Sequence, residues 1–102
     1  MSDQPNDGLM DEVHEMISLA ESGEDYDEAL ASSIRNVQSS DATLRMNALH
    51  YFSHIARVYR RLDLDVALPL MRKGEADADP EAAAAARDTL EDLEIFLPGF
   101  KA

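Results

Sequence analysis

Apolar residues recur every three or four positions along most of the chain, a spacing that predicts amphipathic α-helices. The first such pattern predicts a helix over residues 9–21, which ends at Ser22 and Gly23. Its predicted buried face consists of Leu9, Val13, Met16, Ile17 and Ala20. We expect the preceding segment, residues 1–8, to be disordered, because it lacks this pattern.

A helical hairpin is predicted over residues 25–62. Asp25 and Glu28 have the spacing of a capping box at the start of its first helix. The expected buried face of that helix is Tyr26, Ala29, Leu30, Ile34 or Ser33, and Val37. Asp41 caps the second helix, and we expect this helix to form the centre of the core. Its long apolar stripe comprises Leu44, Ala48, Tyr51, Phe52, Ile55, Val58, Tyr59 and Leu62.

A second hairpin is predicted over residues 64–97. Its first helix covers residues 66–73, with a kink at Pro69 and with Gly74 as the C-terminal cap. Asp79 followed by Pro80 is a strong start signal for the last helix, because proline suits the first helical position. That helix is expected to end before Pro98 and Gly99.

The two hairpins align with each other at an offset of 38 residues without a gap. The offset places Asp41 on Asp79, and it also superposes apolar positions of both hairpins. A two-helix unit of this length is typical of α-solenoid repeats, although two unrelated amphipathic hairpins also match at some offset. The matched pairs are Ala29 with Ala67, Leu30 with Leu68, Ala48 with Ala86, Phe52 with Leu90, Ile55 with Leu93 and Tyr59 with Leu97.

The stretch from Asp41 to Leu49 (DATLRMNAL) resembles the second-helix signature of HEAT-type repeats, and residues 68–71 (LPLM) are similar to their kinked first helix. The second unit departs from that pattern, because Ala83 stands where the first unit has Arg45. The resemblance covers residues 25–97 and implies a scaffold that binds other proteins, without catalytic residues. The expected fold is therefore all-α: five helices in a right-handed α-solenoid-like or helical-bundle domain over residues 9–102, with the first helix as a cap.

Two repeats are fewer than the roughly three that a free-standing solenoid usually needs. We therefore expect the last helix, which carries Phe96, Leu97 and Phe100 near its end, to remain open for self-association or for a partner. A homodimer is one outcome of this arrangement.

The amino-acid composition excludes several classes of functional site. A chain of 102 residues without cysteine forms no disulfide, thiolate zinc site or iron–sulfur cluster, and it has no thiol nucleophile. Its N-terminal residues are acidic rather than basic, and no apolar run approaches the roughly 18 residues of a membrane span. We expect a soluble, cytoplasmic protein that is not an enzyme and has no cofactor.

The net charge of −12 is distributed unevenly. Residues 1–28 carry −10, residues 29–74 carry +4 and residues 75–102 carry −6. The acidic ends could neutralise the basic middle, present an acidic face to a basic partner, or reflect adaptation to a saline cytoplasm. Because nucleic acids and anionic lipids carry negative charge, we expect the chain to bind neither nucleic acid nor a membrane.

Three groups of side chains are candidates for binding. The acidic group predicted to contact a partner comprises Glu24, Asp25, Asp27, Glu28, Asp88, Glu91, Asp92 and Glu94. The basic group, expected to flank one helix–helix corner and to suit an anion, comprises Arg57, Arg60, Arg61, Arg72 and Lys73. The third group is the helix face of His50, His54, Arg57 and Arg61, where the two histidines have metal-chelating spacing.

The histidine spacing has a simpler explanation as a polar helix face, because Tyr51 occupies the position of the glutamate in an HExxH motif. The leading hypothesis is a non-enzymatic interaction module that presents an acidic surface to a basic protein, as an adaptor, regulator or inhibitor. The alternative is a small ligand-binding or metal-binding regulatory domain that uses the histidine face.

Overall fold

The computed structural model describes residues 7–100, with the side chains of residues 13–19 and 22–100. These residues form an all-α fold, as predicted, and none of them lies in a strand. The five helices are α1 (Asp7–Ser22), α2 (Tyr26–Val37), α3 (Ala42–Tyr59), α4 (Leu64–Gly74) and α5 (Pro80–Phe96). No helix within this part of the chain is both long and apolar enough to cross a membrane.

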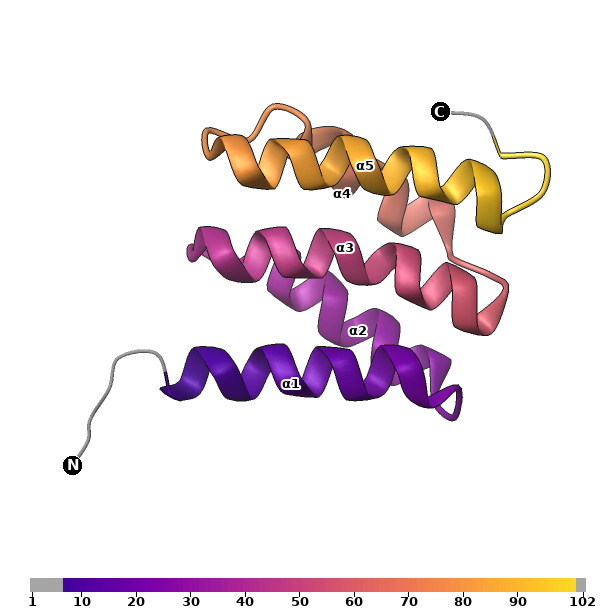
Figure 1. Cartoon of the computed structure of the whole chain (residues 1–102), viewed down its shortest axis with the longest axis horizontal. Helices are drawn as coiled ribbons and strands as arrows, with labels where there is room; N and C mark the ends of the chain where they lie inside the picture. The colour runs from indigo at the N-terminus through magenta and orange to yellow at the C-terminus, as the bar shows by residue number, and fades with distance from the viewer. Residues whose placement is uncertain (1–6, 101–102) are drawn as a thin grey trace.

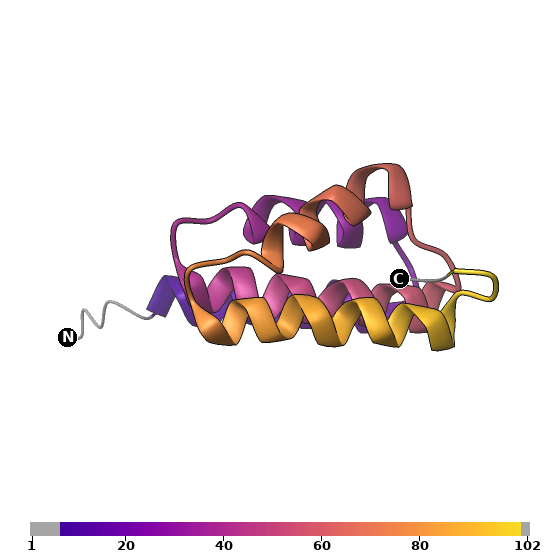
Figure 2. The same cartoon turned by 90° about the horizontal axis from the view of Figure 1, so that it is seen from above.

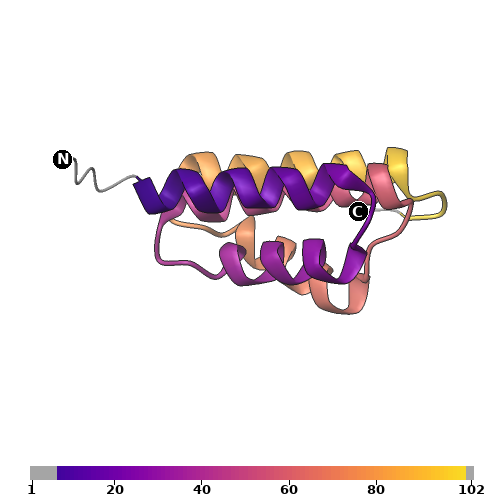
Figure 3. The same ribbon diagram turned by 90° about the horizontal axis from the view of Figure 1, so that it is seen from below.

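The helices form two layers. Helices α1, α3 and α5 lie side by side and run in the same direction, with α3 in the middle (Figure 1). Helices α2 and α4 run the opposite way and form the second layer, which the two turned views show edge-on (Figures 2 and 3). Helix α1 packs on α2 and α3, so it covers the first hairpin at the position expected of a capping helix.

Side-chain caps fix the starts of three helices. The Asp25 carboxylate accepts from the backbone N–H of Glu28 at 3.0 Å, and Asp41 accepts from Thr43 at 2.8 Å. Asp79 accepts from Ala82 at 2.9 Å, and Pro80 is the first residue of α5. All three predicted N-caps are therefore confirmed, because each carboxylate satisfies a backbone donor that has no partner inside the helix.

The start of α1 differs from the prediction. The helix begins at Asp7, so residues 7 and 8 are helical rather than disordered, and residues 1–6 lie outside the described part of the chain. The helix ends at Ser22, and Gly23 follows with φ of 72°, a left-handed conformation that glycine adopts without steric cost. Of its predicted buried face, Met16 is buried while Val13 and Ile17 are half-buried, and the side chains of Leu9 and Ala20 are not described.

The prediction that Gly74 caps α4 is wrong. Gly74 is the last residue of the helix and is buried, and the cap is Glu75 in a right-handed conformation. A Cβ at position 74 would lie 3.0 Å from the Cβ of Ala86 and 3.2 Å from a methyl of Leu49. Glycine thus allows α4 to approach α3 and α5 closely, and the helix continues through Pro69 to reach this contact.

Helix α3 supplies the centre of the core, as predicted, because it contacts all four other helices. Phe52, Ile55 and Ala48 are fully buried. Leu49 and Ala56 are also fully buried, although they lie outside the predicted stripe. A helix with neighbours on several sides buries more than one stripe, which is why a single-face prediction missed them.

The buried face of α2 is more polar than predicted. Ser32, Ser33 and Asn36 are buried, whereas Leu30 and Ile34 are only half-buried. The Asn36 side-chain amide donates to the carbonyl of Ser32 at 2.8 Å, and this bond satisfies a donor that burial removes from water. Of the two residues considered for the core, Ser33 rather than Ile34 occupies the buried position.

The 38-residue offset also relates the observed helices. Helix α4 begins 38 residues after α2, and α5 begins 38 residues after α3. Ala29 and Ala67 are buried at equivalent positions in the two hairpins, and so are Ala48 and Ala86. The same holds for Phe52 with Leu90 and for Ile55 with Leu93. The two hairpins therefore bury equivalent residues, as the alignment of the sequence with itself predicts.

Candidate functional site

The acidic residues of α5 lie on an exposed face of an edge helix. Asp88, Glu91 and Glu94 are exposed and Asp92 is half-exposed. The side chains of Asp88, Glu91 and Asp92 make no hydrogen bond or ion pair with any described residue, whereas Glu94 has such an interaction. Ile95, on the same stretch of helix, is 73% exposed. We call Asp88, Glu91, Asp92 and Ile95 the α5 surface.

The acidic residues of the α1–α2 turn and of the first turn of α2 are exposed as well, but one caps a helix and another lies near an arginine. Asp25 caps α2, and Asp27 lies 4.0 Å from the guanidinium of Arg61. Only Glu24 and Glu28 have side chains without such a contact to the described residues. This group offers less free charge to a partner than its sequence suggests.

The two acidic groups do not form one surface. Helix α5 contacts α3 and α4 but neither α1 nor α2 within the described residues. The α1–α2 turn and α5 lie on opposite sides of α3, as Figure 1 shows. The two acidic groups are therefore separated by a helix.

The predicted basic corner is also divided. Arg57 lies in the last turn of α3, and Arg60 and Arg61 follow in the α3–α4 turn, whereas Arg72 and Lys73 lie in the last turn of α4. An 11-residue helix is about 16 Å long, so the two sets lie at opposite ends of α4. Expecting all five bases at one corner was wrong, because they are close in sequence but separated by a helix.

Arg61 belongs to an aromatic cluster that sequence reasoning assigned only to the core. Its guanidinium carbon lies 3.7 Å above the ring of Tyr26, which meets Tyr59 edge to face at 5.6 Å. The Tyr59 hydroxyl donates to the carbonyl of Leu19 at 2.8 Å, and the Tyr26 hydroxyl accepts from the backbone of Asp63. Two tyrosines thus join α1, α2 and the α3–α4 turn, and one of them makes a cation–π contact with Arg61.

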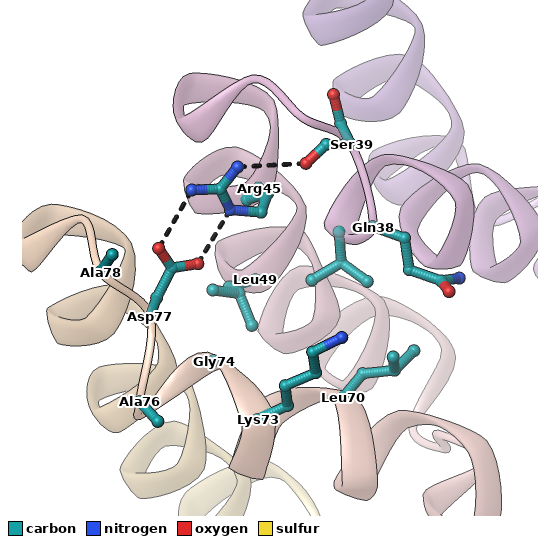
Figure 4. Close-up of a pocket in the computed structure, with 11 residues that line it drawn as sticks. Gln38, Ser39, Arg45, Leu49, Leu70, Lys73, Gly74, Ala76, Asp77 and Ala78 are labelled. Atoms are coloured by element: carbon teal, nitrogen blue, oxygen red, sulfur yellow. Dashed lines mark hydrogen bonds and ion pairs between the residues drawn. The ribbon is translucent and has the colours of Figure 1, made fainter.

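Arg45 forms the most complete polar contact among the described residues, and sequence reasoning noted it only as part of the repeat motif. Its Nε and Nη2 donate to the two carboxylate oxygens of Asp77 at 2.8 and 3.0 Å. Its Nη1 donates to the carbonyls of Ser39 and Ser40, both at 3.1 Å. The contact borders a pocket of about 460 Å³ between the α2–α3 and α4–α5 loops, which Lys73 also lines (Figure 4).

These bonds affect the protonation of both partners. The hydrogen bond from Arg45, followed by that from the backbone N–H of Asp79, lowers the pKa of Asp77 below its usual value of 3.8. The same side-chain bond raises the pKa of Arg45. Both groups are therefore charged over the whole neutral range and act as a structural pair between the hairpins.

The histidine face is not assembled as predicted. His50 and His54 are half-buried, and His54 Nδ1 lies 3.2 Å from Arg57 Nη2. Arg61 lies past the end of α3 and contacts Tyr26, so it is not part of the histidine face. Among the residues whose side chains are described, no three His, Asp or Glu residues gather as a metal site would require. Two histidines beside an arginine are a poor cation site.

The apolar end of the last helix is partly covered. Phe96, Leu97 and Phe100 are half-buried and pack against the core, since the chain after α5 turns back toward the molecule (Figure 2). Self-association through these side chains remains a prediction.

Comparisons of the chain with protein-family models, with curated proteins and with solved structures give no match. Any conclusion about function therefore depends on the residues described above.

Proposed function

We propose that this protein is a non-enzymatic interaction module whose α5 surface binds a basic protein partner, as an adaptor, regulator or inhibitor. One observation carries the proposal: three acidic side chains on an edge helix lack internal partners, beside the most exposed large apolar residue among those described. Unpaired surface charge steers an oppositely charged partner, and an apolar neighbour adds buried area in the complex.

The arrangement of the helices supports an interaction role. In a stack of helical hairpins, the outer helix has a face that another protein can cover, and scaffolds of HEAT type use such faces. Helix α5 is at the edge of its layer. Its counterpart in the first hairpin, 38 residues earlier, is α3, and α5 covers one side of α3. A partner helix beside α5 would extend the stack by one position.

The α1–α2 acidic group is the weaker half of the predicted site. Asp25 and Asp27 are engaged in a helix cap and in a contact with Arg61, so a partner would have to compete with those interactions. We therefore assign the primary contact to the α5 surface. The α1–α2 group then contributes through the long-range field of the protein.

Site-specific photo-crosslinking in cells of the source organism tests this assignment. Benzoylphenylalanine is placed at Ile95 or, as the control, at Val66, which is the other exposed large apolar residue, 39% exposed on α4. We expect position 95 to crosslink to one basic protein and position 66 not to do so. Equal crosslinking from both positions, an acidic product, or no product from position 95 would each contradict the proposal.

A further inference from the structure

A largely apolar groove lies where the α3–α4 turn meets the segment that follows α5. Its volume is about 650 Å³, within the range of small-molecule sites. One wall is formed by Leu62, Leu64 and Leu68, and the other by residues 97–100. Among the described residues, Arg61 is the one charged residue that lines it.

The guanidinium of Arg61 has unused hydrogen-bonding capacity. Its central carbon lies 3.7 Å from the centroid of the Tyr26 ring, and it makes no hydrogen bond with any described residue. The nearest carboxylate oxygen, that of Asp27, is 4.0 Å away, which is too far for a hydrogen bond, and the Asp27 side chain is 94% exposed. Contact with an aromatic ring does not use the N–H groups of an arginine, and these groups match the two oxygens of a carboxylate.

We propose that this groove binds an amphiphilic monocarboxylate of the fatty-acid type. The carboxylate accepts hydrogen bonds from Arg61, and the hydrocarbon chain lies along Leu62, Leu64 and Leu68 toward Phe100. This site is separate from the α5 surface and does not depend on the proposed protein partner.

The chemistry of the lining favours a hydrocarbon chain over a peptide. Apart from Arg61, the described lining residues have side chains that are apolar or, at Gly99, absent, so they offer no side-chain partner to the amide groups of a peptide. A hydrocarbon chain has no such groups and gains from leaving water.

Nearby charged residues both favour and oppose the binding of a carboxylate at Arg61. Arg57 and Arg60 precede Arg61 in the chain and add positive charge to this end of a protein whose net charge is −12. Asp27 and Asp63 line the neighbouring pocket of about 350 Å³, which shares Arg61 and Leu62 with the groove. Asp27 is therefore the internal competitor for Arg61, and a bound carboxylate would take its place.

Titration of the full ¹⁵N-labelled chain with decanoate, below its micelle concentration, tests the proposal by nuclear magnetic resonance. We expect saturable shifts confined to the amides of residues 61–68 and 97–100. Decanol, which has the same chain length without the carboxylate, should bind at least about tenfold more weakly, because its hydroxyl lacks the negative charge and the second oxygen that pair with Arg61.

Two variants with opposite expected effects on affinity distinguish a change in decanoate recognition from a change in the stability of the protein. Arg61→Gln should weaken decanoate binding at least about tenfold, since it removes the charged guanidinium group. Asp27→Asn should strengthen binding about two- to fivefold, since it removes the competing carboxylate. Arg87→Gln, at an exposed arginine of α5 without a described side-chain partner, serves as the matched control and should leave affinity unchanged.

Circular dichroism of each variant verifies that its fold is retained. The proposal is overturned if decanoate gives no saturable shifts in the groove, if decanol binds equally well, or if Arg61→Gln binds as tightly as the unaltered protein.

Discussion

Arg45 joins the two helical hairpins through a single carboxylate. It binds both oxygens of Asp77 in the α4–α5 loop and two carbonyls in the α2–α3 loop. Asp77→Ala removes both charged bonds and the acceptor of the Asp79 backbone N–H, so it should lower the free energy of unfolding by about 1–3 kcal/mol. Urea unfolding at pH 7 measures the loss.

Glu75→Ala is the matched control, because the Arg72–Glu75 pair is longer, at 3.6 Å, and more exposed. Its removal should cost between zero and about 1 kcal/mol. Equal losses in the two variants would show that the Arg45–Asp77 contact has no special role between the hairpins.

The lowered pKa of Asp77 predicts a dependence of stability on pH. A carboxyl group whose pKa is lower in the folded state stabilises the protein fully above its unfolded pKa of about 3.9, and this contribution disappears as the pH falls through the folded value. Asp77→Asn lacks the contribution. The difference in unfolding free energy between the unaltered protein and Asp77→Asn should be constant from about pH 5 to 7 and shrink below about pH 4. A difference that persists unchanged at pH 2 would contradict this account.

Ser32 is a residue whose side chain the fold does not use. Its hydroxyl is fully buried and has no hydrogen-bond partner among the residues that the structure describes. Ser32→Ala should therefore be neutral or should stabilise the protein by up to about 1 kcal/mol, because it removes an unpaired polar group. Thermal unfolding is the measurement. Thr89→Val provides the contrast, since the buried Thr89 hydroxyl donates to the carbonyl of Leu49 at 2.8 Å and its loss should cost about 1 kcal/mol.

At the scale of elements, Gly74 sets how closely α4 approaches α3 and α5. Gly74→Ala should destabilise the protein by about 1–3 kcal/mol, because the new methyl group would press on Ala86 and Leu49. This loss should occur even though alanine is about 1 kcal/mol better than glycine inside an isolated helix. Chemical denaturation measures it. The double variant Gly74→Ala with Ala86→Gly should recover part of the loss, and no recovery would contradict the proposed contact.

The helices themselves were largely predictable because local chemistry determines them. Asp25, Asp41 and Asp79 cap their helices at the expected residues, and the apolar spacing gave the number and order of the helices. The burial pattern was less predictable where packing overrides periodicity. Leu49 and Ala56 are buried because α3 has neighbours on several sides, and Gly74 serves a close contact rather than a cap.

The candidate sites were less predictable than the helices, because they depend on which ends of which helices meet. The five bases are close in sequence, yet α4 separates Arg72 and Lys73 from the rest. The stacking of Arg61 on Tyr26 joins residues 35 positions apart, and no local spacing rule indicates it. The acidic pattern of α5 was visible in the sequence, but only the structure distinguishes unpaired acids from those with structural roles.

At the scale of the whole molecule, the acidic residues exceed what internal ion pairs can neutralise. The net charge is −12, and the ion pairs among the described residues include Arg45–Asp77, Arg61–Asp27 and Arg72–Glu75. Repulsion among the remaining carboxylates should destabilise the compact state and be screened by salt. We therefore expect the thermal midpoint to rise as sodium chloride increases from about 0.02 to 1 M. A midpoint that falls over this range would indicate that attractive pairs dominate.

The account depends most on the α5 surface as the site that a basic partner contacts. The most direct test is the dissociation constant of the crosslinked partner for three proteins at one ionic strength: the unaltered chain, the α5 variant Asp88→Lys, Glu91→Lys, Asp92→Lys, and the α1–α2 variant Glu24→Lys, Asp27→Lys, Glu28→Lys. Both variants change the net charge equally. We predict that the α5 variant binds at least about tenfold more weakly and that the α1–α2 variant stays within about threefold of the unaltered protein. Equal weakening in both variants, or unchanged affinity in the α5 variant, would contradict the assignment of the partner to α5.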